Sequence, residues 1–488
     1  MSSLDSLPSD ILYLICTHLC RHCHPPSVLA LVNQGESPDV ASSQAALVAL
    51  CSTSRCLRDV AQTFLWHAPT IRDHGRFVRA VMARPDLALH TRYLPGRRWL
   101  ETPTVCRYPE DLALCKRVAQ MLFLELPFDP DFNDACRGDD GVDYFFTQLL
   151  VSLLPRVEIF YVDTRLDRGR DYVDWHRANF YNLEWRFDVL EHIDLDPASR
   201  RFPNLRTVII DGGDTRACRT MSLIGLVTML SAATNLRCLV LFQVRGFERH
   251  PDQRHLLPPS LQQVRELVLD EFNLYIDPTR QNYRSLENLI RLCPALQAFT
   301  LRPLPSRDAS LAKGHHLSRS RLLDSLLPAS ETLTSLTIRL SHVRVSRWDF
   351  MPGPQPAMLQ FPCLTTLVLD EQFFCRHWLP AKFGGYADDQ TTCLTELLPQ
   401  TMTLLGIRLH HKFRALNDVC HLGKEVATGM FPALQRVEID VLNHVRSRPN
   451  NPAWARRLGK RLEAYRESAR QAFDGTSVQA HIREVLTH

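Results

Sequence analysis

The chain has 488 residues, more than one ordinary hydrophobic core accommodates, so the length predicts several domains or an array of repeats. Hydrophobic residues make up 45% of the sequence and charged residues 23%, which excludes the composition of an intrinsically disordered protein. The net charge of +4 is small for this length and favours neither a nucleic-acid partner nor a membrane surface.

The first residues, MSSLDSLPSDILYLICTHL, lack the basic segment and small-residue cleavage site of a signal peptide. No apolar run approaches the roughly 18 residues of a membrane span. The 15 cysteines are scattered, and several lie inside apolar patterns, which is typical of reduced, buried thiols. We therefore expect a cytoplasmic or nuclear protein.

The first predicted helix follows Leu7 and Pro8, with Ser9 or Asp10 as its N-cap. Its apolar residues recur at helical spacing and are Ile11, Leu14, Ile15 and Leu19. The segment ALVALCSTSRCLRDVAQTFLWHAPTI (46–71) predicts two further helices, with a break near residues 52–54. Between the two segments, residues 20–44 are polar and contain proline, and they predict an inserted loop.

This order of a Leu-Pro pair, a helix and a Cys-containing helical pair resembles the F-box, over residues 1–72 with the loop included. The resemblance implies binding to the Skp-family adaptor of cullin–RING ubiquitin ligases. By the same resemblance, the contacts with the adaptor would come from Leu7, Pro8, Ile11, Leu14, Ile15, Leu50, Leu57 and Phe64. The alternative is that some of these side chains form the core of a three-helix bundle.

After a linker with the first solenoid helices (73–150), a short pattern recurs: apolar, two variable residues, apolar, one variable residue, apolar. Copies start at 154, 205, 236, 264, 296, 333, 364, 402 and 434, and an irregular copy spans 190–195. The alternation within each copy predicts a strand, and helix-like segments lie between copies at 218–232, 283–293, 321–327 and 392–398.

A strand and a helix every 28 to 38 residues cannot bury an apolar face alone, so stacking into a solenoid is expected over 151–445. The predicted class is α/β, with parallel strands inside and helices outside. The units resemble the leucine-rich repeats of F-box proteins, as at Cys293-Pro294. A doubly wound sheet is the alternative, but the chain shows no Gly-rich phosphate loop.

The third and fifth positions of each copy are expected on the open face of the solenoid, followed by a charged row at the seventh position. Within that row, Arg302, Arg339 and Arg408 predict a site for an acidic or phosphorylated segment of a protein target. The alternative is that the β-branched residues beside them simply suit strands. The C-terminal residues 446–488 are expected to form a helical cap, with an amphipathic helix over 452–473.

The segment CTHLCRHCH (16–24) contains six potential zinc ligands, but structural zinc sites draw ligand pairs from distant segments. The second pair is missing here unless Cys51 and Cys56 supply it. The sequence therefore predicts no metal and no cofactor. No catalytic motif of a known class is visible. The sequence predicts a non-enzymatic substrate receptor of a Skp–cullin–F-box ligase; the alternatives are a scaffold that binds the adaptor without directing ubiquitination, and an enzyme using the Cys16–His24 cluster.

Overall fold

The computed structural model places the chain in the α/β class, in two compact units, 1–264 and 265–488. None of its described helices combines the length and the apolar character that crossing a membrane requires. The structure describes residues 4, 7–20, 22–23, 38–69, 71, 74–94, 110, 113–114, 117–118, 149–150, 153–163, 202–211, 221–222, 230, 233–244, 247–248, 259–272, 281–303, 318–340, 357–374, 394–409, 415–443 and 452–486.

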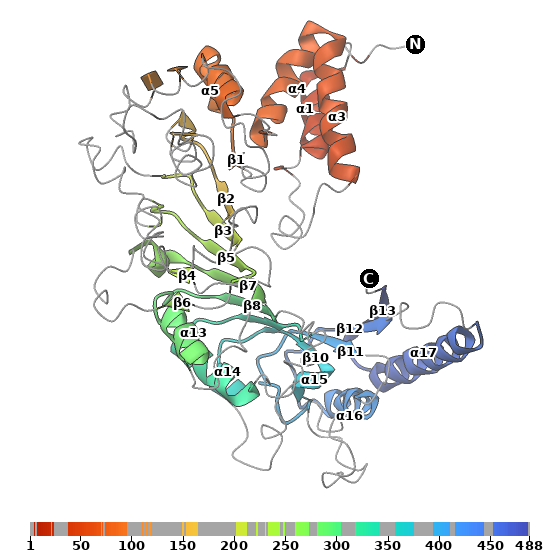
Figure 1. Cartoon of the computed structure of the whole chain (residues 1–488). Helices are drawn as coiled ribbons and strands as arrows, with labels where there is room; N and C mark the ends of the chain where they lie inside the picture. Colours follow the sequence, from red (N-terminus) through yellow and green to blue (C-terminus); the bar gives the residue numbers. More distant parts are fainter. Residues whose placement is uncertain are drawn as a thin grey trace. The chain divides into compact units, whose positions relative to one another are not determined.

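The first unit begins with helices α1 (Ser9–Leu19), α3 (Pro38–Thr53) and α4 (Arg55–His67), which among the described residues pack on one another (Figure 1). The predicted break is confirmed, because Ser54 caps α4 and its hydroxyl accepts a hydrogen bond from the Leu57 N–H at 3.2 Å. The core between the helices consists of Cys16, Cys20, Leu47, Ala61 and Phe64.

Two local predictions for this bundle were wrong. The N-cap of α1 is Pro8, whose carbonyl accepts hydrogen bonds from Ile11 and Leu12, so neither predicted side chain caps the helix. Helix α3 begins at Pro38, inside the predicted loop, because proline suits a first helical turn.

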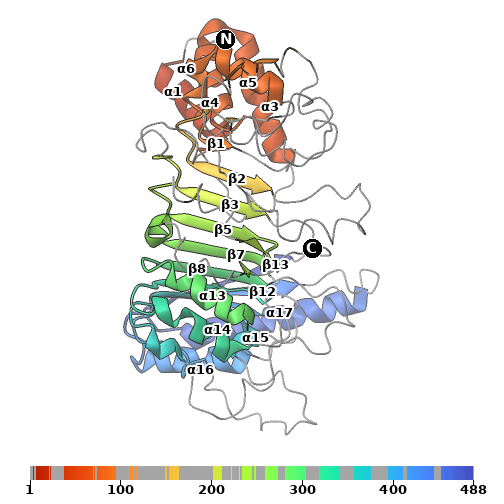
Figure 2. The same ribbon diagram turned by 60° about the vertical axis from the view of Figure 1, so that its left-hand side comes forward.

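Beyond these helices, the described part of the first unit has four parallel strands in the order β1-β2-β3-β5, which follow one another in Figure 2. Their bounds are Tyr93–Leu94, Ile159–Asp163, Thr207–Asp211 and Cys238–Phe242. The two-residue strands β4 (Met221–Ser222) and β6 (Phe247–Glu248) pair separately. The short helices are α5 (His74–Ala83), α6 (Pro85–Ala88) and the 3₁₀ turn η5 (Pro259–Gln263).

The second unit has seven described strands, all parallel and in chain order. They are β7 (Glu266–Phe272), β8 (Ala298–Pro303), β9 (Ser335–Ile338), β10 (Thr366–Asp370), β11 (Leu404–Leu409), β12 (Arg436–Asn443) and β13 (Gln479–Leu486). The intervening helices are α13 (Gln281–Arg291), α14 (Arg319–Leu326), η7 (Leu327–Ala329), η9 (Ala357–Gln360), α15 (Glu371–Phe374), α16 (Leu416–Ala427) and α17 (Pro452–Phe473). Helices α13, α14 and α16 lie on one side of these strands (Figure 1).

Strand pairing in the second unit follows the alignment of the sequence copies. Ser335, Thr366 and Leu404, all third positions, pair across β9, β10 and β11. The residues that follow these positions, Leu336, Leu367 and Leu405, are buried, and the third and fifth positions of β8, β9 and β10 are half-buried. One face of the strands therefore forms the core, and the other lies closer to solvent.

Threonines just before the strands connect neighbouring copies. The hydroxyl of Thr334 donates to the carbonyl of Gln297 at 3.0 Å, that of Thr365 to Thr334 at 3.2 Å, and that of Thr403 to Thr365 at 3.0 Å. These hydrogen bonds satisfy carbonyls at the turns that enter the strands, so each copy is held to the one before it.

Other predicted boundaries need correction. The first copy was placed three residues too early: Phe160 pairs with Val208, so the aligned copy starts at Val157 rather than at 154. Residues 394–397 form turns where the sequence predicted a helix. The C-terminal helix α17 is confirmed, but the predicted helical cap also contains strand β13, which extends the sheet. The irregular copy at 190–195 and most of the helix predicted at 218–232 lie outside the described residues.

Candidate protein-docking groove

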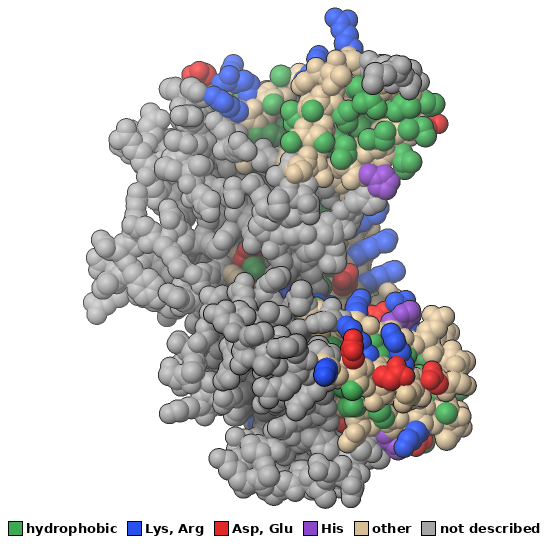
Figure 3. Space-filling model, turned by 90° about the vertical axis from the view of Figure 1, so that its right-hand side faces the viewer, with side chains coloured by type: hydrophobic (Ala, Val, Ile, Leu, Met, Phe, Trp, Pro, Cys, Tyr) green, Lys and Arg blue, Asp and Glu red, His purple; other side chains and the backbone are tan. Residues whose placement is uncertain are grey.

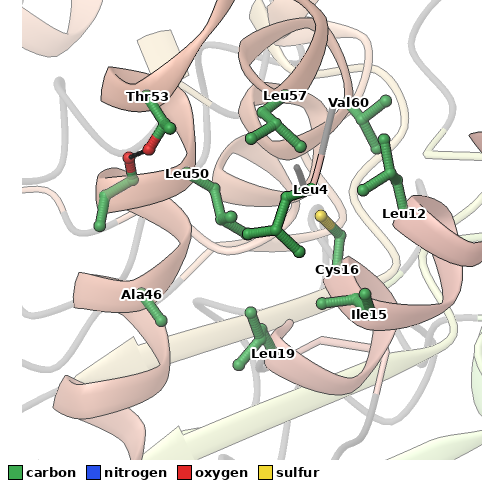
Figure 4. Close-up of a pocket in the computed structure, with 11 residues that line it drawn as sticks. Leu4, Leu12, Ile15, Cys16, Leu19, Ala46, Leu50, Thr53, Leu57 and Val60 are labelled. Carbon is green, nitrogen blue, oxygen red and sulfur yellow. Dashed lines mark hydrogen bonds between the residues drawn. The ribbon is translucent and has the colours of Figure 1, made fainter. Parts of the chain in front are cut away.

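An apolar groove lies between α1 and α3, with α4 beneath it (Figure 4). Its volume is about 260 Å³. Among the described lining residues, only Thr53 has a polar side-chain oxygen. The lining residues are Leu4, Leu12, Ile15, Cys16, Leu19, Ala46, Ala49, Leu50, Thr53, Leu57 and Val60. Small side chains at Ala46 and Ala49 keep α3 from filling the space, which leaves the groove open.

Large apolar side chains also project into solvent around the groove. Leu14 is 55% exposed, Val48 51%, Tyr13 50%, Leu4 49% and Ile11 43%. Figure 3 shows apolar side chains gathered over the N-terminal helices. Single exposed apolar residues are ordinary, but such a cluster beside an apolar groove is typical of a surface that another protein covers.

The structure brings most of the predicted adaptor contacts to this surface. Ile11 and Leu14 project into solvent, and Pro8 is exposed just before the helix. Leu7 is half-buried. Ile15 and Leu50 are half-buried and line the groove.

Two of the predicted contacts are core residues. Leu57, 2% exposed, forms part of the floor of the groove. Phe64, 5% exposed, packs in the bundle core with its ring 5.4 Å from that of Tyr13. We therefore assign Phe64 to the support of the helices rather than to their outer surface. Sequence reasoning missed Leu4 and Val48, whose exposure depends on how the helices pack.

The Cys16 thiol, which lines the groove, carries no charge at neutral pH. Burial raises the pKa of Cys16, and the neighbouring thiols Cys51 and Cys20 raise it further. Burial also raises the pKa of Cys51, against a smaller opposite influence of Arg58. A partner would therefore be bound here through apolar contact rather than through ion pairing.

A row of charges follows the strands of the second unit at the seventh position of each copy. From β7 to β12 the residues are Asp270, Arg302, Arg339, Asp370, Arg408 and Asp440, and Arg483 of β13 continues the row beside Asp440. The signs alternate except where Arg302 and Arg339 are adjacent. Charges of opposite sign on neighbouring strands attract each other, so this row links the copies.

Two of the arginines predicted to bind a target are held within this row. Arg302 forms a two-point ion pair with Asp270. Its Nε donates to Asp270 Oδ1, and its Nη2 donates to Asp270 Oδ2 at 2.8 Å. Arg408 Nη1 lies 3.4 Å from Asp370 Oδ1. The sequence prediction assumed that both guanidinium groups were available to bind a target. Their ion pairs with aspartates of the neighbouring strands limit that availability.

Arg339 stands between these two pairs. Its pKa is lowered by burial and by the positive charges of Arg408 and Arg302, against opposite influences of Asp370 and Asp440. Its Nε atom is buried and has no hydrogen-bond partner among the described residues. An anionic group placed near Arg339 would offset this repulsion, so the prediction of an acidic target segment now depends mainly on this residue.

Asp370 gives the row a pH dependence. Burial raises the pKa of its carboxyl from 3.8 to about 6, although Arg408, the Leu340 N–H at 2.6 Å and Arg339 act in the opposite direction. The folded protein therefore binds this proton more tightly than the unfolded chain does. Its contribution to stability is present below pH 3.8 and is lost as the pH rises through about 6.

We expect Asp370→Asn, which cannot titrate, to remove this loss. Relative to the variant, the wild type should lose about 2 kcal/mol of unfolding free energy between about pH 4 and pH 7. Urea unfolding of both proteins across this range measures the difference. If the unfolding free energies of the wild type and the variant change with pH in parallel, the Asp370 carboxyl has its ordinary pKa in the folded protein.

The potential metal ligands of residues 16–24 are only partly brought together. Cys20 and Cys23 meet His67 at the end of α4, and the ligand atoms of these three residues lie within 4.8 Å of one another. Cys16 lines the groove instead, and Cys51 and Cys56 belong to no such group within the described ranges. The distant ligand is therefore His67, which the sequence analysis did not consider.

No protein-family model matches the chain, and no curated protein matches its sequence.

Proposed function

We propose that this chain is the substrate-recognition subunit of a Skp–cullin–F-box ubiquitin ligase. The N-terminal helices would bind the Skp-family adaptor, and the strand–helix copies would bind a target protein as a leucine-rich-repeat solenoid. The observation that carries the proposal is the apolar groove of the N-terminal bundle, with Ile11 and Leu14 exposed beside it. The sequence of the same helices resembles the F-box.

The groove favours a partner that contributes apolar side chains. Each large apolar side chain that an adaptor removes from water contributes about 1.5–3 kcal/mol. The five exposed side chains around the groove could thus provide most of the free energy of a stable complex. The small size of the bundle gives the same expectation, because about 60 residues bury little apolar surface on their own.

The repeated strands support the second half of the proposal. Parallel strands in chain order, with helices on one side, leave the half-buried third and fifth positions on the other. Such a face is where stacked repeats bind extended partners. Arg339 would contact an acidic or phosphorylated residue of the target, and the ubiquitin-transfer chemistry would belong to the cullin and RING subunits.

Purification of the full chain from cells tests the proposal against a scaffold that binds the adaptor alone. A substrate receptor should recover both the adaptor and a cullin, and a scaffold only the adaptor. The variant Ile11→Asp/Leu14→Asp should lose both, and Cys56→Asp, at an exposed residue that does not line the groove, should keep both. Recovery of the adaptor without cullin would reject the ligase assignment.

A further inference from the structure

A cluster of sulfur and nitrogen atoms lies where α1 and α4 end. Cys20 is the C-cap of α1 and is 2% exposed, Cys23 lies in the turn that follows, and His67 is the last residue of α4. His67 Nδ1 lies 3.6 Å from Cys20 Sγ and 3.4 Å from Cys23 Sγ. One imidazole nitrogen therefore faces two sulfurs that come from a segment more than 40 residues away in the sequence.

These distances fit a tetrahedral zinc site. With Zn–S bonds near 2.3 Å and Zn–N bonds near 2.0–2.1 Å, a tetrahedron places sulfur and nitrogen about 3.6 Å apart. Both measured separations agree with this edge to within a few tenths of an ångström. Two residues separate Cys20 from Cys23, which is a common spacing for a pair of zinc ligands.

A fourth donor, a nitrogen on His22, lies beside Cys23 and outside the 4.8 Å group that the other three residues form. His22 Nδ1 is 3.9 Å from Cys23 Sγ, and the His22 ring centroid is 5.6 Å from that of His67. Its other nitrogen, Nε2, is 3.8 Å from a carboxylate oxygen of Glu158. Glu158 also lies 3.5 Å from Arg92. A carboxylate behind a histidine ring is one of the usual means of orienting a zinc-bound imidazole.

We propose that Cys20, Cys23, His67 and His22 bind one Zn²⁺, with Glu158 orienting His22. The metal would fasten the end of α1 and the turn after it to the end of α4. It would also tie the N-terminal helices to the segment that enters β2. Because the unfolded chain does not hold these ligands together, zinc binding would stabilise the folded state. This site is independent of the proposed ligase function.

Metal analysis of the full chain, purified under reducing conditions without chelator, tests the proposal. We expect about one zinc per chain in the wild type. Replacement of the zinc by Co²⁺ should give the intense visible bands of tetrahedral cobalt with thiolate charge transfer. His67→Ala and Cys23→Ser should lose stoichiometric zinc and these bands, whereas Cys56→Ser, at an exposed thiol outside the cluster, should keep both.

Two further measurements keep the test valid if a cysteine variant fails to fold. His22→Ala retains three ligands and should weaken zinc binding at least tenfold, measured by competition with a chromophoric chelator. Adding a strong chelator to the wild type should lower its melting temperature, but should leave that of His67→Ala unchanged. Wild-type protein without stoichiometric zinc and unable to bind Co²⁺, or variants that bind as well as the wild type, would overturn the proposal.

Discussion

Replacing Ile11 and Leu14 by aspartate should weaken binding to a Skp-family adaptor at least 100-fold and leave the helical content unchanged. Both side chains project into solvent, at 43% and 55% exposure, so the substitutions disturb no core packing. Each large apolar side chain that the adaptor no longer buries costs about 1.5–3 kcal/mol of binding free energy, and tenfold in affinity corresponds to about 1.4 kcal/mol. Buried carboxylates opposite an apolar partner would add a desolvation penalty.

The measurement is titration of the purified variant with the adaptor, together with circular dichroism of the free protein. Cys56→Asp is the matched control, since it adds one negative charge at an exposed position of α4 that does not line the groove. This control should bind like the wild type. Equal weakening by both variants would mean that charge, and not the apolar surface, governs the interaction.

Asp270→Ala should destabilise the second unit by about 3 kcal/mol. Asp270 is fully buried and holds Arg302 through two hydrogen bonds, so its removal leaves a guanidinium group without its carboxylate. Breaking a buried ion pair from one side typically costs about 3–5 kcal/mol. We expect the lower end of this range because the side chain of Arg302 is 28% exposed and water can screen its charge.

Chemical denaturation of the full chain measures this destabilisation, and a double variant separates the pair from simple packing. Asp270→Leu/Arg302→Met replaces both charges by apolar groups of similar length and should recover most of the stability, because neither charge is then left unpaired. If Asp270→Ala is as stable as the wild type, the row of charges does not hold the strands together.

The strands were the part of the fold that the sequence predicted best, because alternation between buried and half-buried residues is a local signal. The copies at 333, 364 and 402 pair in the register that their alignment implied. The start of the first copy was predicted wrongly because Leu154, Val157 and Phe160 are apolar at intervals of three. The repeat pattern therefore fits the sequence equally well when it starts at residue 154 or at residue 157. Strand β13 was missed because exposed polar residues such as Gln479 and Arg483 interrupt its short apolar pattern.

The candidate sites depended on information that no local pattern contains. The residues that line the groove follow from how α1, α3 and α4 pack, which is why Phe64 was predicted at the surface and Val48 was not. The row of charges was placed correctly, but the pairing of Arg302 with Asp270 only follows once neighbouring strands are known. His67 meets Cys20 across 47 residues, a proximity that spacing alone does not indicate.

The most direct test of the proposed function is calorimetric titration of the unaltered full chain with a purified Skp-family adaptor. The apolar groove predicts saturable one-to-one binding with a dissociation constant below about 1 µM. It also predicts a heat of binding that becomes more negative with rising temperature, the mark of buried apolar surface. Absence of binding at adaptor concentrations of tens of micromolar would contradict the assignment of these helices to a ubiquitin ligase.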